Sequence, residues 1–399
     1  MRTPFTEESG AAAPCSVPGI SGDRPTSAVV DLDALDRNFG EVLRRAGGRS
    51  VLAVVKARAY GHGAVPVSLR LLEAGARMLG VALVEEGREL RNAGITAPVL
   101  VMGALFPEQA DAIAELGLIP VVYSMPVARA LSAAAVRRAG RIPVHVKIDT
   151  GMGRIGVMPA DAVRFIQELR RLEGIDVQGL MTHFADADLA DKQFSSDQMD
   201  RFEQVVRSLE SGGISVPERH AANSAALLDY PRALFTLVRP GLMLYGYNPF
   251  AAVLPDLDLH PVLSLVTHIA SIKRVPAGVP ISYGRTFTTK RESLIATIPI
   301  GYADGYSRSL SNRGEALVRG TRVPVAGRVC MDMCMLDVTA VPGVSDQDEV
   351  VLLGRQGGER ITADDIAKLC GTIPYEVLCG IGQRVPRVYR QTNPRKTGV

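Results

Sequence analysis

The chain of 399 residues lacks tryptophan, and only 5% of its residues are aromatic. Few flat side chains are therefore available for stacking on bases. A net charge of +3, from 45 basic and 42 acidic residues, is too small for this length to indicate a nucleic-acid or anionic membrane surface. No run approaches the roughly 20 apolar residues that span a bilayer. We therefore expect neither a nucleic-acid nor a membrane partner.

Cysteine is scarce and irregularly spaced. The five cysteines are an odd number and form no C-x-x-C pair, which argues against a disulfide framework and against a zinc site. Reduced thiols fit a cytoplasmic protein, and the sequence predicts no metal centre. Residues 1–26 lack the continuous apolar segment of a secretory signal, so we interpret them as a disordered extension.

Strand-like and helix-like segments alternate between residues 27 and 259. The expected strands are short apolar runs at 51–55, 78–82, 98–102, 118–123, 143–148, 177–182, 218–221 and 235–238. Amphipathic stretches lie between them, and several begin with proline, which suits a first helical turn. Such repeats predict a (β/α)8 TIM-type barrel of the α/β class. An open dinucleotide-binding sheet is disfavoured, since no G-x-G-x-x-G follows the first strand.

The pattern changes after residue 260. β-branched runs separated by Gly, Pro and Asp extend to about residue 390 and predict a second, mostly β C-terminal domain. The expected organisation is therefore an extension at 1–26, a barrel at 27–259, a β domain at 260–390 and a tail at 391–399.

Lys56 stands at the end of the first barrel strand, directly before the turn 57–63. Partial burial there removes water from an ammonium and favours the neutral amine, which can form a Schiff base with a carbonyl. A solvated lysine is the ordinary alternative. Other polar or glycine positions also follow expected strands: Arg154, His183, Ser224, Arg239 and Gly241. Because the carboxyl ends of barrel strands share one rim, this group predicts a site there.

A series of motifs in fixed order carries a family resemblance. They are Ala53–Gly63, Lys147–Arg154, Thr182–Ala185, Ala222–Ser224, Arg239–Gly246, Ser282–Gly284, Gly301–Gly305, Cys330–Asp332 and Tyr375–Glu376. Through them the chain resembles the pyridoxal-phosphate-dependent alanine racemases of fold-type III, from about residue 28 to residue 389. The resemblance implies the same barrel and β domain. It also implies interconversion of L- and D-alanine, which would supply D-alanine for peptidoglycan.

The resemblance assigns two groups to proton transfer at the substrate Cα. Lys56 would hold the cofactor aldehyde and, once freed by the substrate amine, act as one acid/base group. Tyr283 would be the other. Racemisation removes a proton from one face and returns one to the opposite face, so two opposed groups are a geometric requirement. In this family the tyrosine comes from the partner subunit, which implies a homodimer with shared active sites.

Further residues are implied to hold cofactor and substrate. Arg239 would face the pyridine nitrogen and, since a guanidinium keeps its protons and has no acceptor, leave the ring neutral. His183 would lie beside the ring and hydrogen-bond Arg239. The remaining positions that match cofactor contacts are Tyr60, Asn223, Ser224, Gly241, Leu242 and Tyr375. Arg154, Met331, Tyr302 and Asp332 match the substrate pocket, and Lys147 matches a lysine that many members carry carbamylated.

Two departures from the family pattern bear on substrate range. Arg58 and Pro374 each stand where Asn is common; the first adds a cation near the cofactor, and the second removes a backbone donor beside its phosphate. Racemases acting on serine, lysine or arginine therefore stay open as an alternative. A fold-type III decarboxylase would generally carry an acidic residue in place of Arg239. A small cofactor-homeostasis protein with this barrel would lack the β domain.

Overall fold

The computed structural model describes residues 24–250 and 256–392, which separate into two compact units. The barrel unit comprises Ala34–Pro261 together with Pro374–Cys379. The β unit comprises the described residues up to Asp33, Val262–Ile373, and the described residues from Gly380 onward.

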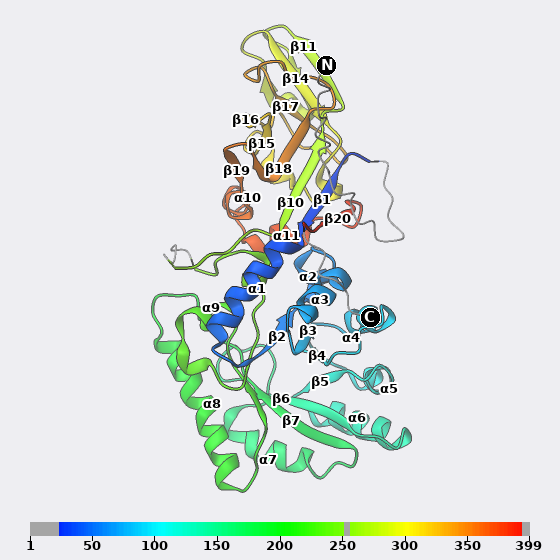
Figure 1. The fold of residues 1–399 in the computed structure, drawn as a ribbon, viewed down its shortest axis with the longest axis vertical. Coiled ribbons are helices and arrows are strands. Elements are labelled where there is room, and N and C mark those ends of the chain that lie inside the picture. Colours follow the sequence, from blue (N-terminus) through cyan, green and yellow to red (C-terminus); the bar gives the residue numbers. More distant parts are fainter. Residues whose placement is uncertain (1–23, 251–255, 393–399) are drawn as a thin grey trace, which may run out of the picture. The chain divides into compact units, whose positions relative to one another are not determined.

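Eight parallel strands form the barrel (Figure 1). They are β2 (Ser50–Val54), β3 (Met78–Val81), β4 (Val99–Val101), β5 (Ile119–Val122), β6 (Ile142–Lys147), β7 (Ile175–Met181), β8 (Glu218–His220) and β9 (Leu237–Val238), paired in the order β8-β7-β6-β5-β4-β3-β2-β9. Backbone bonds from Thr236 N to Arg219 O (3.1 Å) and from Arg239 N to Ala222 O (2.9 Å) join β9 to β8. The sheet is thereby closed, and a closed barrel covered by helices favours largely apolar, buried strands such as β2, β3, β4 and β5.

Helices connect the strands because apolar residues recur on one face of each connecting segment. In the helix between β1 and β2, for example, Leu35, Phe39 and Val42 are buried, while basic residues occupy the last turn. The helices are α1 (Leu32–Ala46), α2 (Lys56–Tyr60), α3 (Ala64–Glu73), α4 (Val84–Asn92), α5 (Ala110–Glu115), α6 (Met125–Arg137), α7 (Pro159–Leu169), α8 (Gln193–Ser211), α9 (Ser224–Asp229) and α11 (Pro374–Gly380), with 3-10 turns η1 (Pro107–Gln109), η2 (Pro231–Ala233) and η3 (Leu242–Tyr245).

The β unit contains three sheets. One has the order β16-β15-β18-β10-β1-β20 with β19 beside β18, and the others are β11-β14-β17 and β12-β13. The strands are β1 (Ser27–Asp31), β10 (Leu263–His268), β11 (Ser271–Val275), β12 (Pro280–Ile281), β13 (Phe287–Thr288), β14 (Ser293–Ile298), β15 (Glu315–Val318), β16 (Thr321–Pro324), β17 (Cys334–Asp337), β18 (Glu349–Gln356), β19 (Glu359–Ile361) and β20 (Arg387–Arg390). Shorter helices are η4 (Tyr283–Arg285), η5 (Tyr302–Asp304), η6 (Arg308–Leu310) and α10 (Ala363–Cys370). The expected fold class, a TIM-type barrel with a mostly β second domain, is confirmed.

The structure differs from the expected organisation near the chain's beginning and end. Residues 27–31 form β1, which pairs with β10 and β20 in the β unit and not with the barrel. Thr26 is buried and bonds Thr267 Oγ1 at 2.8 Å, so the expectation of disorder up to residue 26 is wrong for its last residues. Residues 1–23 and 393–399 lie outside the described part. The segment 374–379, expected in the β domain, belongs to the barrel unit because it packs on the turn after β2.

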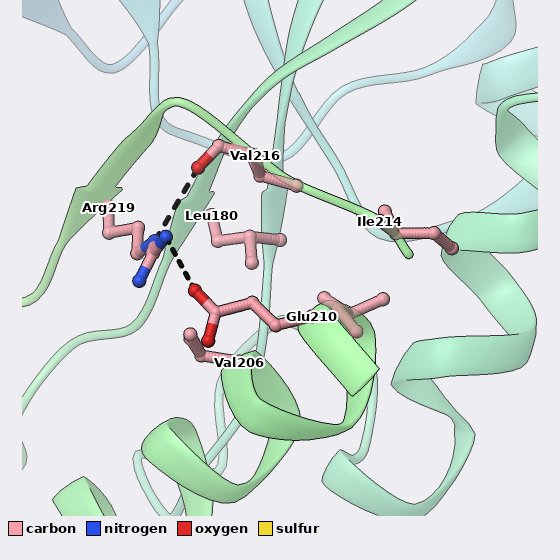
Figure 2. A pocket seen from close by; sticks show the side chains of 7 residues that line it. Leu180, Val206, Glu210, Ile214, Val216 and Arg219 are labelled. Carbon is pink, nitrogen blue, oxygen red and sulfur yellow. Dashed lines mark hydrogen bonds and ion pairs between the residues drawn. The ribbon is translucent and has the colours of Figure 1, made fainter. Parts of the chain in front are cut away.

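A crevice of the barrel unit lies apart from the expected site residues. Figure 2 shows this small crevice between β7, β8 and the end of α8, bounded by an ion pair of Arg219 with Glu210 at 2.8 Å; none of the expected site residues lines it. Within the described ranges, no helix combines the length and apolar content required to cross a bilayer. The same ranges hold no group of three or more His, Cys, Asp or Glu side chains placed to bind a metal ion. The four described cysteines are free thiols, and Cys15 lies outside the described residues.

Candidate active site

Lys56 lies two residues beyond the end of β2, at the start of a left-handed turn. The φ angles of residues 57–60 are all between 52° and 56°. Left-handed helical backbone costs roughly 1–2 kcal/mol per non-glycine residue, so this turn is strained. Backbone bonds from Ala59 N to Val55 O (2.8 Å) and from Gly61 N to Ala57 O (3.0 Å) hold it. Burial, reinforced by the nearby Arg154 cation, lowers the pKa of Lys56, which favours the nucleophilic amine.

A cradle of small groups and hydroxyls follows β8 and β9 at the same rim. Ser224 Oγ accepts the backbone N–H of Gly241 at 2.9 Å and that of Met243 at 3.3 Å. With both bonds accepted, the hydroxyl proton of Ser224 is left to donate elsewhere. A Cβ added to Gly241 would lie 2.6 Å from Tyr60 Oη, so a larger residue there would displace the Tyr60 hydroxyl. Asn223 caps α9 through Oδ1, which accepts Ala226 N at 3.0 Å.

Two phenols adjoin this cradle. The rings of Tyr60 and Tyr375 lie 5.8 Å apart, and Tyr60 stacks on Tyr245 at 4.8 Å. Burial raises the pKa of Tyr60 and raises that of Tyr375 to about 12. Both phenols therefore keep their protons at neutral pH and can act as hydrogen-bond donors. Leu242, the first residue of η3, is also buried beside Gly241.

Arg239, directly after β9, is held inside the barrel by four acceptors. Nη2 donates to Thr182 O (2.8 Å), Ala221 O (3.0 Å) and His183 Nδ1 (3.3 Å), and Nη1 donates to His220 Nδ1 (2.9 Å). Burial lowers the pKa of Arg239 to about 9, which leaves it cationic at neutral pH. The expected contact with His183 is present, but His220 makes the shorter bond.

The contact with His220 begins a chain of groups through the barrel interior. His220 Nε2 lies 2.8 Å from His145 Nδ1, and His145 Nε2 lies 3.4 Å from Glu218 Oε2. Burial keeps both histidines neutral, because it lowers the pKa of His145 to about 3 and that of His220 well below its usual range. Arginine can only donate, so His220 must carry its proton on Nε2 and His145 must carry its own on Nε2. The donors then all point from Arg239 toward the Glu218 carboxylate.

The loop after β6 presents Arg154 and is shaped by two polar residues. Asp149 Oδ1 accepts the backbone N–H groups of Gly151 and Gly153, both at 3.1 Å. Gln198 on α8 is fully buried and bridges this loop to the next, since Nε2 donates to Thr150 Oγ1 (3.3 Å) and to His183 O (3.0 Å). Lys147, the last residue of β6, is 2% exposed, and burial with the neighbouring arginine cations lowers its pKa to about 8.

The other expected site residues belong to the β unit. Tyr283, Met331 and Tyr302 are 72%, 53% and 42% exposed, and Asp332 is exposed and pairs with Arg384 at 2.7 Å. Their segments are bonded together: Ser282 Oγ donates to Arg328 O at 2.7 Å, and Tyr302 N donates to Cys330 O at 3.0 Å. Ser282 has φ 67°, a strained conformation immediately before Tyr283. The β unit thus presents these four residues on one exposed surface.

Both departures from the family pattern have a local structural account. Arg58 has φ 56°, in the left-handed region that Asn tolerates better than Arg, so the substitution adds strain. Pro374 is the first residue of α11, where its fixed φ is favourable and its missing N–H costs little.

Several residues were missed by the sequence reasoning. His145 interrupts the mostly apolar strand β6, and a polar residue within an apolar run was a usable signal. His220 gave no such signal, because it follows a glutamate and an arginine in β8. Gly179 opposite His145 gave none, because its role is visible only in three dimensions: a Cβ there would lie 2.4 Å from His145 Nδ1. Gln198 could not be singled out either, because it is one of many polar residues in the segment that forms α8.

The chain is similar to known proteins over most of its length. Residues 30–249 match the family profile described as the N-terminal domain of alanine racemase, and residues 262–389 match that of its C-terminal domain. The alanine racemase of Halothermothrix orenii is 48% identical over 368 residues, covering 92% of this chain and 97% of the relative. "Alanine racemase 2" of Caldanaerobacter subterraneus is 50% identical, covering 92% and 95%.

Solved structures are similar over nearly the whole chain. Alanine racemase from Clostridium difficile superposes with a TM-score of 0.90 at 40% identity, covering 93% of this chain and 97% of that one. The Bacillus anthracis enzyme with bound L-Ala-P has a TM-score of 0.88 at 38% identity, covering 94% and 97%. With both domain profiles matched and relatives 48–50% identical over 92% of the chain, this chain belongs to the alanine racemase family.

Proposed function

We propose that this protein interconverts L- and D-alanine with pyridoxal 5'-phosphate as its cofactor. Family membership supports the reaction class. The observation that carries the proposal is the lysine with a lowered pKa on the same barrel rim as Arg239 and the Ser224–Gly241 cradle. The same reasoning gives a cytoplasmic enzyme that supplies D-alanine for peptidoglycan, which rescue of a D-alanine auxotroph by cytoplasmic expression would test.

The chemistry of the donor set fits this cofactor. A phosphate dianion needs donors and little negative charge, and the cradle offers the Ser224 hydroxyl together with two phenols kept protonated by their raised pKa values. Gly241 leaves the space that a Cβ would fill. Asn223 and Leu242 flank this cradle, Arg239 offers a donor-only group for a ring nitrogen, and Lys56 offers the amine. His183 would lie beside the ring.

The residues divide the work of racemisation. When bound, the cofactor supplies an aldehyde that captures the substrate amine and a conjugated ring that takes up the electrons left at Cα. Lys56 moves a proton on one face of Cα, and Tyr283 moves one on the other. Arg239 withholds a proton from the ring nitrogen, which limits the lifetime of the carbanion. Arg154 and the backbone of Met331 bind the substrate carboxylate, with Tyr302 and Asp332 at the entrance.

The substrate is proposed to be alanine. One related structure, from Bacillus anthracis, holds L-Ala-P, and another, from Clostridium difficile, is a complex with cycloserine; both ligands are small. The test is hydrogen exchange at Cα in heavy water across all amino acids. We expect incorporation of deuterium into alanine together with racemisation. Faster exchange of serine, lysine or arginine would replace this proposal with a broader racemase, and loss of CO2 without racemisation would replace it with a decarboxylase.

We expect Tyr283→Phe to reduce proton abstraction from L-alanine more than from D-alanine. The change removes the hydroxyl while keeping the ring, and acid/base groups contribute about 10²–10⁴-fold to rate. Initial rates in both directions, with the primary isotope effect of Cα-deuterated substrate, measure the asymmetry. Equal losses in both directions would contradict the opposed arrangement. Tyr302→Phe serves as the control for direction, because a change at the pocket entrance should affect both directions equally.

The exposure of Tyr283, Tyr302 and Met331 supports a homodimer in which this surface covers the partner's barrel rim. Mixing inactive Lys56→Ala subunits with Tyr283→Phe subunits tests this arrangement. A shared site regains activity in mixed dimers, because one of the two sites then has both groups. No gain after subunit exchange has been verified would refute it.

Lys147 is proposed to be carbamylated. An amine with a pKa of about 8 is about one-tenth neutral at pH 7, far more than an ordinary lysine, and neutral amine adds to CO2 with release of a proton. The product would replace a buried cation with an anion between arginines. At fixed pressure of ¹³CO2, we expect a carbamate ¹³C resonance that grows as the pH rises from 6 to about 8. Its persistence in Lys147→Arg, which keeps a cation but no reactive amine, would refute the assignment.

A further inference from the structure

The carboxylate of Glu86 contacts the turn that carries Lys56. Oε1 accepts the backbone N–H of Ala57 at 2.6 Å, and Oε2 accepts those of Ala82 at 2.7 Å and Leu83 at 3.1 Å. Glu86 is in the first turn of α4, so the bond to Leu83 is an ordinary helix cap. The bond to Ala57 is different, since it reaches 29 positions back along the chain to the residue that follows Lys56.

The turn after Lys56 needs such an external partner. Four consecutive left-handed residues are unfavourable for L-amino acids, and the backbone there cannot extend β2. An ionised acceptor makes a stronger bond to an N–H than a neutral one does. Glu86 also ties the ends of β2 and β3 together through one side chain, so it restricts the direction in which Lys56 leaves the sheet.

The charge of Glu86 acts on Lys56 as well. The charged or titratable groups that influence Lys56 are Glu86 and Cys379, which raise its pKa, and Arg154, which lowers it. Lys147 and His183 lie within the same electrostatic group. Burial and cations favour the neutral amine, so Glu86 is the carboxylate that opposes them. It thereby keeps Lys56 able to hold a proton as well as give one up, which a two-way acid/base group requires.

We propose that Glu86 is a positioning residue for Lys56: its Oε1 fixes the left-handed turn, and its negative charge balances the ionisation of the lysine amine. This inference rests on the proposed function only for the catalytic use of Lys56. A simple helix cap would need Oε2 alone. The helix cap therefore depends on Oε2, whereas the positioning of Lys56 depends on Oε1 and on the charge.

Glu86→Gln tests the proposal at nearly constant shape. The amide oxygen can still cap Ala82 and Leu83, but its NH2 then faces the N–H of Ala57, and the charge is gone. Glu86→Asp keeps the charge with a shorter reach. Glu89→Gln, an exposed position on the same helix, is the matched control. In the full-length chain freed of cofactor, competitive labelling of the Lys56 amine against pH, read by mass spectrometry, measures its pKa directly.

We expect Glu86→Gln to lower the pKa of Lys56 relative to wild type and Glu89→Gln, and to reduce kcat by about 10–100-fold, the range expected for one charge-assisted hydrogen bond. In Glu86→Asp, we expect the pKa of Lys56 to lie close to the wild-type value, while kcat stays below that of wild type. An unchanged pKa in Glu86→Gln overturns the proposal, including when kcat falls together with the thermal unfolding midpoint, because that combination indicates a cap alone. If wild-type enzyme fails to racemise alanine, the proposed function fails, while the labelling comparison still decides the role of Glu86.

Discussion

We expect Lys56→Ala to reduce racemisation of both enantiomers by about 10³-fold or more. An acid/base group alone contributes about 10²–10⁴-fold to rate. The loss is larger than for any other single residue because the variant lacks both the amine that anchors the cofactor and one of the two proton carriers. The partly buried position and lowered pKa of Lys56 are the structural reason to assign both roles to it. Racemisation by polarimetry in each direction measures the effect.

Cofactor retention separates the two roles of Lys56. We expect Lys56→Ala to lose the covalent attachment, so that borohydride no longer fixes cofactor to the protein. Lys273→Ala, an exposed lysine on β11, should match wild type in both activity and attachment. Lys56→Ala protein that retains a borohydride-fixed cofactor and racemises at a wild-type rate would remove the basis of the proposed mechanism.

Arg239→Glu is expected to give the second largest effect, a slower racemisation accompanied by more transamination. A carboxylate at this position can hold a proton on the ring nitrogen, whereas the guanidinium cannot accept one. A protonated ring stabilises the carbanion more strongly, so protonation at the wrong carbon competes better with its return to Cα. The ratio of pyruvate formed to alanine racemised measures this partition.

The buried contacts of Arg239 determine the proper control for that experiment. Its guanidinium donates to His220 Nδ1 at 2.9 Å and to three other acceptors, so any replacement leaves some of them unpaired. Arg239→Lys keeps a cation without an acceptor, and we expect it to lose activity without raising the pyruvate ratio. Equal pyruvate ratios in Arg239→Glu and Arg239→Lys would refute the argument from ring charge.

The buried chain of groups from Arg239 to Glu218 affects the charge of the arginine. Arg239 donates to His220, and His220 donates to His145, so each bond polarises the next. The Glu218 carboxylate lies 3.4 Å beyond His145 Nε2, and its negative charge favours the arginine cation at the other end of this chain. Burial acts against the cation by lowering the pKa of Arg239 to about 9, which is still above neutral pH. The interior of this barrel therefore contributes to the charge state at its rim.

The periodicity of the sequence was sufficient for much of the fold. Short apolar runs predicted the barrel strands to within one or two residues at most ends, since strands covered by helices on one face and by the barrel core on the other are largely apolar. Strand β1 was assigned to the wrong unit because its apolar pattern, Ala28 to Val30, is the same whether it pairs with a barrel strand or with β10. Pairing partners are a tertiary property.

The sequence by itself determined the chemical groups of the site and their order along the chain: an amine after a strand, an arginine without a nearby acid, and a cradle of Gly and Ser. Only the tertiary structure decided how these groups are supported. It brought Glu86 to the backbone of Ala57, aligned His220 and His145 behind Arg239, and placed Gln198 between two loops. The identity of each side chain can be read directly from the sequence. The hydrogen-bond partners that set its orientation and charge come from segments distant in sequence. Only the closed barrel brings those segments within bonding distance.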